Sequence, residues 1–218
     1  MPENPDRFRY ANVELLKAIS GITGKPFLVD SSKTRRRLRR YQQCSDIDLK
    51  VVHLLRHPLG VAASSKRKGA NGLKPIRVLR GWRIHNEKLC KLLKEQPRQV
   101  SLLRLRHEDF ATDPEKWLRV IADWMGLTFE RSQLEYYETP HHIPSGNRLR
   151  LSLAEGRAIS LDTGWISRVT LGERIYLWLT ARHFLTNLGY KCVISNEGDF
   201  VVPWPSSDEG APQTIGTA

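Results

Sequence analysis

The chain has 218 residues, 40% hydrophobic and 27% charged, which fits one globular domain with a full core. No apolar stretch approaches the roughly 20 residues of a membrane span, and residues 1–16 lack the apolar core of a secretory signal. We therefore expect a cytoplasmic location. The formal net charge of +12 predicts affinity for anions such as nucleic acid, anionic lipid, or a phosphorylated or sulfated small molecule. The three cysteines are far apart and form no CxxC pair, which argues against a disulfide framework or a metal site.

Periodicity and end signals predict strands that alternate with helices along the chain. Helices are predicted over residues 11–21, 33–43, 58–67, 76–95, 113–127 and 172–190, and strands over 26–30, 49–56 and 99–109. This order predicts an α/β fold of three layers, a mostly parallel sheet with helices on both faces. We expect residues 1–195 to form this domain and residues 196–218, rich in Gly, Pro, Ser and Thr, to form a weakly ordered tail.

Ligands of such sheets bind outside the carboxyl ends of the strands, which directs attention to three places. At one of them, Arg56 ends an apolar strand, and Ser64 follows eight residues later in a helix that begins near Pro58. A guanidinium, a hydroxyl and helix N-terminal amides together suit a phosphate. An ordinary strand-helix junction with an arginine at its edge is the alternative. At the polar end of the third strand, Glu108 and Asp109 are interpreted as structural, pairing with nearby arginines or capping a turn.

Four segments, in order, are similar to one protein family. LLRHPLGVAASS (54–65) resembles the sulfotransferase stretch LvRDPrgvaaS, with the same spacing from arginine to serine. KPFLVDSSKTRRRL (25–38) is similar to the ivDsSK segment, and residues 103–127 resemble the vrYEDLvadPe segment of the same superfamily. HHIPSGNRLR (141–150) is similar to a late loop that closes over the nucleotide. The resemblance implies a P-loop NTPase-like fold and the sulfate donor PAPS, with PAP as product.

The resemblance also implies the roles of individual residues. Arg56 and Ser64 correspond to the pair that binds the 3′-phosphate of the donor. Asp30 matches the position of an acidic base in some relatives, and Lys33 can approach the sulfonate, so both are candidate catalytic residues; a helix N-cap is the alternative for Asp30. The late loop adds four candidate nucleotide contacts, Gly146, Asn147, Arg148 and Arg150. The pattern departs from the family at three positions: His57 replaces an aspartate, Leu59 a basic residue, and His107 a tyrosine.

The family's first strand and its GxxRSGTT-type loop, which holds the 5′-phosphosulfate, have no match in residues 1–29. The fold is therefore expected to be N-terminally incomplete, with impaired sulfuryl transfer to an acceptor hydroxyl or amine. An inactive remnant that binds PAP or another anion, and a basic nucleic-acid-binding module that uses RRRLRR (35–40), are the alternative functions. We expect a small-molecule, glycan or lipid acceptor, no specific nucleic acid, and a second copy of the chain as a further candidate partner.

Overall fold

The computed structural model describes residues 5–66, 74–94, 100–138 and 159–190, with side chains from residue 10 onward. Its elements in chain order are α1 (Pro5–Thr23), α2 (Arg35–Gln42), β1 (Lys50–Leu55), α3 (Pro58–Lys66), α4 (Pro75–Lys94), β2 (Ser101–Arg106), α5 (His107–Thr112), α6 (Pro114–Met125), η2 (Arg131–Glu138), η4 (Ile166–Arg168) and α8 (Leu171–Asn187). The six predicted helices are present, and so are two of the three predicted strands. The expected nucleotide loop at residues 146–150 and the tail at 196–218 lie outside the described residues.

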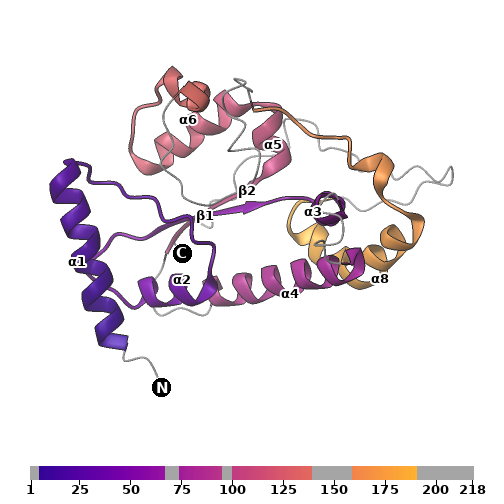
Figure 1. The fold of residues 1–218 in the computed structure, drawn as a ribbon, viewed down its shortest axis with the longest axis horizontal. Helices are drawn as coiled ribbons and strands as arrows, with labels where there is room; N and C mark the ends of the chain where they lie inside the picture. The colour runs from indigo at the N-terminus through magenta and orange to yellow at the C-terminus, as the bar shows by residue number, and fades with distance from the viewer. Residues whose placement is uncertain (1–4, 67–73, 95–99, 139–158, 191–218) are drawn as a thin grey trace. The chain divides into compact units, whose positions relative to one another are not determined.

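The strands β1 and β2 are neighbours in a two-stranded parallel sheet, and α3 and α4 lie between them in the chain (Figure 1). This arrangement confirms the α/β class. The chain divides into two compact units. The first unit holds residues up to Val51 together with Arg83–Leu102, and the second holds Val52–Trp82 together with the described residues from Leu103 onward.

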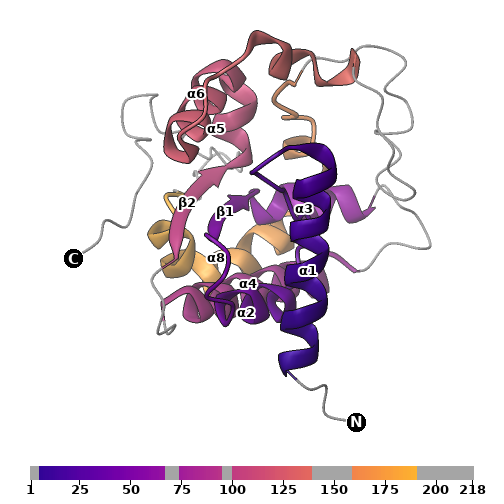
Figure 2. The same ribbon diagram turned by 90° about the vertical axis from the view of Figure 1, so that its left-hand side faces the viewer.

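In the first unit, α1 contacts α2, and an extended segment joins them (Figure 2). The strand predicted over residues 26–30 is wrong, because this segment has no strand hydrogen bonds. Its apolar side chains are also exposed, with Phe27 42% and Val29 88% accessible. A strand is stable only when a neighbour satisfies its backbone groups. Within the described residues, the sheet contains β1 and β2 alone and offers this segment no partner.

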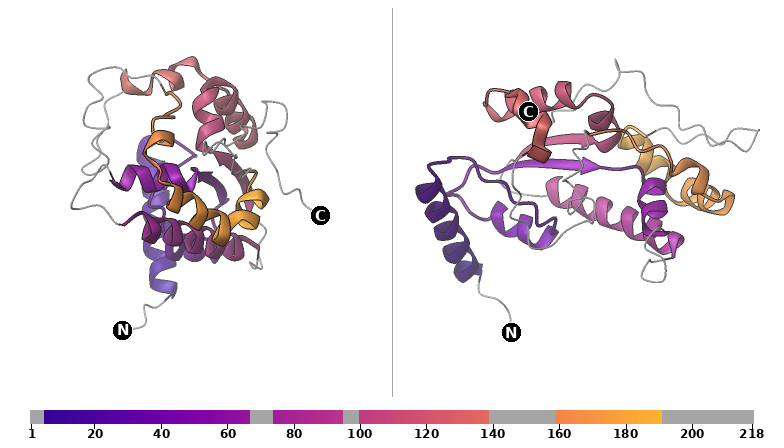
Figure 3. Two further views of the ribbon diagram at one scale, coloured as in Figure 1. Left: turned by 90° about the vertical axis from the view of Figure 1, so that its right-hand side faces the viewer. Right: turned by 45° about the horizontal axis from the view of Figure 1, so that its top comes forward.

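In the second unit, leucines from two strands and two helices form the apolar core: Leu55, Leu59, Leu103, Leu177 and Leu185 are each at most 2% exposed. Small buried residues on α3, Ala62 and Ala63, let this helix pack closely. The helix also contacts η4, the short orange segment that precedes α8 (Figure 3). Core packing thus fixes both the end of β1 and the start of α3.

Local end signals decide the bounds of α6 as predicted. Asp113 caps its start, because the carboxylate accepts a hydrogen bond of 3.1 Å from the backbone N–H of Lys116. Pro114 occupies the first turn, and Gly126 ends the helix in the left-handed region at φ 75°. The short helix α5 was not predicted.

The tryptophans of the second unit differ in burial. Trp117 is 5% exposed, as expected for a core residue, whereas Trp82, Trp124 and Trp178 are half-buried. Trp165 is also 5% exposed, and it packs beside α3. None of the helices in the described part of the chain is long and apolar enough to cross a membrane.

Candidate anion-binding site

Arg56 lies in the two-residue turn between β1 and α3, as the sequence predicts. Its side chain is 27% exposed, and its Nη2 lies 3.3 Å from Oδ2 of Asp162. A Cβ added to Gly60 would lie 3.4 Å from both Arg56 Nε and Trp165 Nε1. The guanidinium and the indole therefore fill the space above the first turn of α3. Gly60 allows this close approach because it has no side chain.

His57 caps the start of α3. Its Nδ1 accepts a hydrogen bond of 3.3 Å from the backbone N–H of Leu59, in the way that an aspartate caps a helix. The imidazole is fully buried, is stacked on Trp165 at 5.1 Å between ring centroids, and meets the Tyr190 ring edge-on at 5.3 Å. Burial lowers the pKa of His57 to about 3, so the ring is neutral at physiological pH. His57 thus fulfils the capping function of the aspartate that the resemblance leads one to expect here, without its charge.

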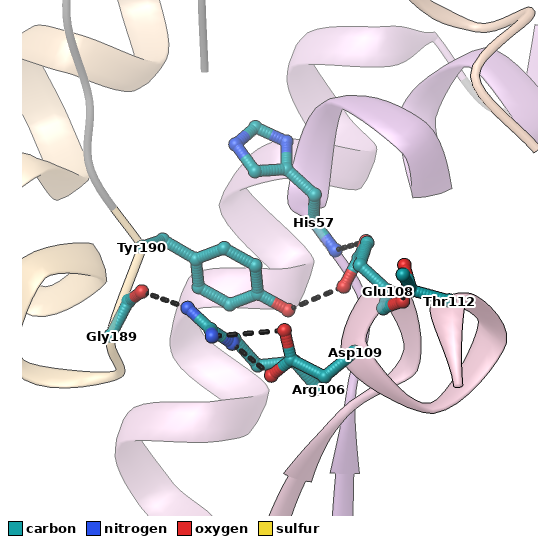
Figure 4. A network of polar contacts seen from close by, with 7 residues as sticks. All are labelled: His57, Arg106, Glu108, Asp109, Thr112, Gly189 and Tyr190. Carbon is teal, nitrogen blue, oxygen red and sulfur yellow. Dashed lines mark hydrogen bonds and ion pairs between the residues drawn. The ribbon is translucent and has the colours of Figure 1, made fainter. Parts of the chain in front are cut away.

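Glu108 fixes the backbone of the turn between β1 and α3. It is 2% exposed, and one carboxylate oxygen accepts a hydrogen bond of 2.7 Å from the backbone N–H of His57. The other oxygen accepts one of 3.0 Å from the hydroxyl of Tyr190, the residue that ends the described chain after α8 (Figure 4). Burial and the charge of Glu108 raise the pKa of Tyr190 well above its usual value, so its proton stays in this bond. One buried carboxylate therefore joins the turn, α5 and the segment after α8.

A second ion pair closes the same region. Arg106 donates to both oxygens of Asp109, at 2.5 Å from Nε and 2.9 Å from Nη2, and its Nη1 donates to the carbonyl of Gly189 (Figure 4). Asp109 therefore has the structural role predicted for it, with an arginine as partner. Glu108 is structural as well, but it pairs with a backbone N–H and a tyrosine.

Two further side chains complete the surroundings of Arg56. Ser64 lies on α3 less than two turns from Pro58 and is partly exposed, so it shares the strand-turn-helix with Arg56. His107 begins α5 and is close enough to Arg56 for its pKa to respond. Burial and the charge of Arg56 lower that pKa, while the charges of Glu108 and Asp162 oppose the shift. The carboxyl ends of β1 and β2 thus present a guanidinium, an imidazole and a hydroxyl.

Asp30, a predicted catalytic residue, belongs to the first unit and is heavily hydrogen-bonded. Its carboxylate accepts from Ser32 N at 2.8 Å and from the Tyr41 hydroxyl at 2.9 Å, and it pairs with Arg37 Nε at 2.5 Å. Burial raises the pKa of Asp30, but the hydrogen bonds from Ser32 and Tyr41 and the charge of Arg37 outweigh this effect and lower it. Asp30 ties the extended segment to α2, whereas the N-cap position of this helix is occupied by Thr34.

Lys33, the second predicted catalytic residue, is exposed and has a left-handed backbone with φ 59°. This conformation is uncommon for a residue with a side chain. Asp30 and Lys33 lie in the first unit, and Arg56 and Ser64 in the second. The structure therefore describes two separate parts of the predicted site.

Three residues at the Arg56 turn were not assigned a role there from sequence: Asp162, Trp165 and Tyr190. Asp162 lies 106 residues after Arg56, and no local pattern marks it. Trp165 and Tyr190 are likewise distant from Arg56 in the sequence, and no local pattern marks their place beside the turn. The burial of both rings follows from tertiary packing.

One comparison with known protein families concerns the segment that carries the Arg56 turn. A model described as "Sulfotransferase family" matches residues 48–131, the span from just before β1 to the first residue of η2. This segment contains the whole Arg56 turn and α3, and its similarity to the sulfotransferase family agrees with the resemblance.

One solved structure similar to the chain is entitled "Sulfotransferase Domain from the Curacin Biosynthetic Pathway", with 22% sequence identity and a TM-score of 0.45. The match covers 72% of this chain and 58% of that one, so the chain spans less than two thirds of the length of this neighbour. A search of curated proteins gave no match.

Proposed function

We propose that the chain is a PAPS-dependent sulfotransferase in which Arg56 and Ser64 bind the 3′-phosphate of the donor. The observation that carries this proposal is the geometry of the turn: the Arg56 guanidinium lies over the first turn of α3, and the buried contacts of His57 fix the turn. A guanidinium favours a phosphate strongly, because it directs several charged N–H donors at the anion.

The reaction transfers a sulfuryl group to an acceptor hydroxyl or amine. The acceptor attacks sulfur, the bond from sulfur to the 5′-phosphate oxygen of PAP breaks, and the acceptor proton passes to a base. Asp30 is the proposed base, and the ammonium group of Lys33 would balance charge on the sulfonate. For Asp30 to take a proton, it must first leave Arg37 and Tyr41, because both now hold its ionised form.

The pairing of Asp30 also favours a second candidate function. A chain whose carboxylate is permanently paired with Arg37 would bind PAP without transferring sulfate. Turnover of PAPS with a panel of sugar, lipid, phenol and peptide acceptors separates the two functions. We still predict that this chain alone transfers sulfate poorly. The cytoplasmic location is likewise a prediction.

Arg56→Ala tests the proposed donor site. Isothermal titration calorimetry with PAP should show a loss of about 1.5–3 kcal/mol, the usual contribution of a hydrogen bond to a charged group. Ser64→Ala should cost about 1 kcal/mol, because a neutral hydroxyl contributes less. Arg131→Ala, which removes an exposed arginine on η2, is the matched control and should leave the affinity unchanged. Unchanged PAP affinity in a folded Arg56→Ala variant would refute the assignment.

A further inference from the structure

The proposed donor site contains an anion of its own. Arg56 Nη2 lies 3.3 Å from Oδ2 of Asp162, and both side chains are partly exposed, at 27% and 37%. A phosphate that approaches Arg56 needs the same N–H donors, because a guanidinium directs its fork in one plane. The Asp162 carboxylate and a ligand phosphate therefore compete for one group.

Buried contacts bring Asp162 to this position. Trp165, three residues later, is 5% exposed, is stacked on His57, and shares the space above Gly60 with Arg56. Between them, the backbone N–H of Gly164 donates to Asp162 Oδ1 at 3.1 Å, which fixes the carboxylate relative to the anchored indole. The packing around α3 thus places Asp162 beside Arg56, so the ion pair does not depend on two flexible side chains alone.

A second arginine lies within this segment. A Cβ added to Gly164 would lie 2.9 Å from Arg168 Nη2 and 3.4 Å from Asp162 Oδ1, so the Arg168 guanidinium and the Asp162 carboxylate border the same small space. A carboxylate displaced from Arg56 would therefore find another cation without moving the anchored Trp165. The competition can be resolved by a rotation of the Asp162 side chain alone.

We propose that Asp162 is a built-in competitor that lowers the affinity of the Arg56 site for a phosphate. A ligand binds there only by displacing a carboxylate, so a dianionic 3′-phosphate succeeds, while a nucleotide without that phosphate gains nothing from Arg56. This inference rests on the proposed role of Arg56.

Asp162→Asn tests the proposal, because the amide keeps the size of the side chain and can still accept from Gly164 while it loses the charge. Calorimetry with PAP should show binding about two- to fivefold tighter than in the wild type, the scale expected for removal of a partly exposed ion pair. Affinity for AMP, which lacks the 3′-phosphate, should stay unchanged. The matched control is Asp123→Asn on α6, an exposed carboxylate whose loss raises the net charge equally and should change neither affinity.

The double variant Arg56→Ala/Asp162→Asn separates the possible failures. The gain from Asp162→Asn should vanish in the Arg56→Ala background. If Arg56→Ala alone leaves PAP affinity unchanged, the proposed function fails. If Arg56→Ala weakens PAP but Asp162→Asn fails to tighten it, the donor site stands and the competitor is wrong. Equal tightening by Asp162→Asn and Asp123→Asn, or tightening of AMP as well, would reduce the effect to net charge and also overturn the inference.

Discussion

The Arg56 turn and the Asp30 segment each carry predicted site residues, but they are held in different ways. The turn is fixed by buried groups: His57 is fully buried, Glu108 is 2% exposed, and Tyr190 is 2% exposed. The segment around Asp30 is exposed throughout, and one cluster of Asp30, Arg37 and Tyr41 ties it to α2. A geometry built from buried hydrogen bonds persists without a ligand, whereas an exposed ion pair can open at little cost. The Arg56 turn is therefore rigid, and the Asp30 segment is adjustable.

Glu108→Ala should produce the largest change, because it removes the acceptor for two buried donors, the N–H of His57 and the hydroxyl of Tyr190. Each unsatisfied buried donor costs roughly 2 kcal/mol, so the free energy of unfolding should fall by roughly 4 kcal/mol in urea titrations. The control Asp123→Ala, at an exposed position, should change it by less than about 0.5 kcal/mol. A loss below about 1 kcal/mol for Glu108→Ala would show that the turn does not depend on this carboxylate.

The second largest effect should be a pH dependence. The folded pKa of His57, about 3, lies below the unfolded value of 6.5, so the unfolded chain binds the extra proton between these values. The contribution of His57 is complete above pH 6.5 and declines as the pH falls, by about 1.4 kcal/mol per unit. Between pH 6.5 and 4.5 the wild type should lose roughly 2.5 kcal/mol more than His57→Asn, whose amide can still cap α3 but does not titrate. Parallel stability curves for the two proteins would contradict a buried neutral imidazole.

The smallest effect should come from the Asp30 cluster. Tyr41→Phe removes the hydroxyl that bonds to Asp30 and to Arg37, and it should lower the free energy of unfolding by about 1 kcal/mol. Asp30→Asn should cost a similar amount, because the ion pair with Arg37 is partly exposed. Thermal melts of both variants beside Glu108→Ala measure the contrast between the two regions. A loss as large as that of Glu108→Ala would show that the Asp30 segment is as firmly held as the turn.

The parts of the fold that could be predicted from the sequence are those set by residues close together in the chain. Asp113, Pro114 and Gly126 are local end signals, and the bounds of α6 follow from them. The strand predicted over 26–30 fails because an apolar run needs a paired neighbour, and that requirement is not local. α5 was missed because six residues carry too little periodicity to mark a helix, so tertiary packing decides it.

The candidate site divides in the same manner. The place of Arg56 and Ser64 in the fold was predictable, since the strand, the turn and the helix that carry them are continuous in the chain. The Arg56 partner Asp162 was not, because the contact joins residues 106 positions apart and depends on the stacking of Trp165. The pairing of Asp30 with Arg37 and Tyr41 was not predictable either. The motif alone suggests that Asp30 is a base, whereas in the structure its carboxylate is held in an ion pair and a hydrogen bond.

The bond between Tyr190 and Glu108 has a consequence for how the protein is made. Tyr190 lies 82 residues after Glu108, and it completes the surroundings of the imidazole that caps α3. During translation, β1, α3 and β2 leave the ribosome well before this tyrosine is synthesised, so the nascent chain carries an unfinished Arg56 turn. The order of synthesis therefore delays completion of the turn until α8 has emerged and docked. Under the proposed function, a ribosome-bound chain stalled before residue 190 should not retain PAP.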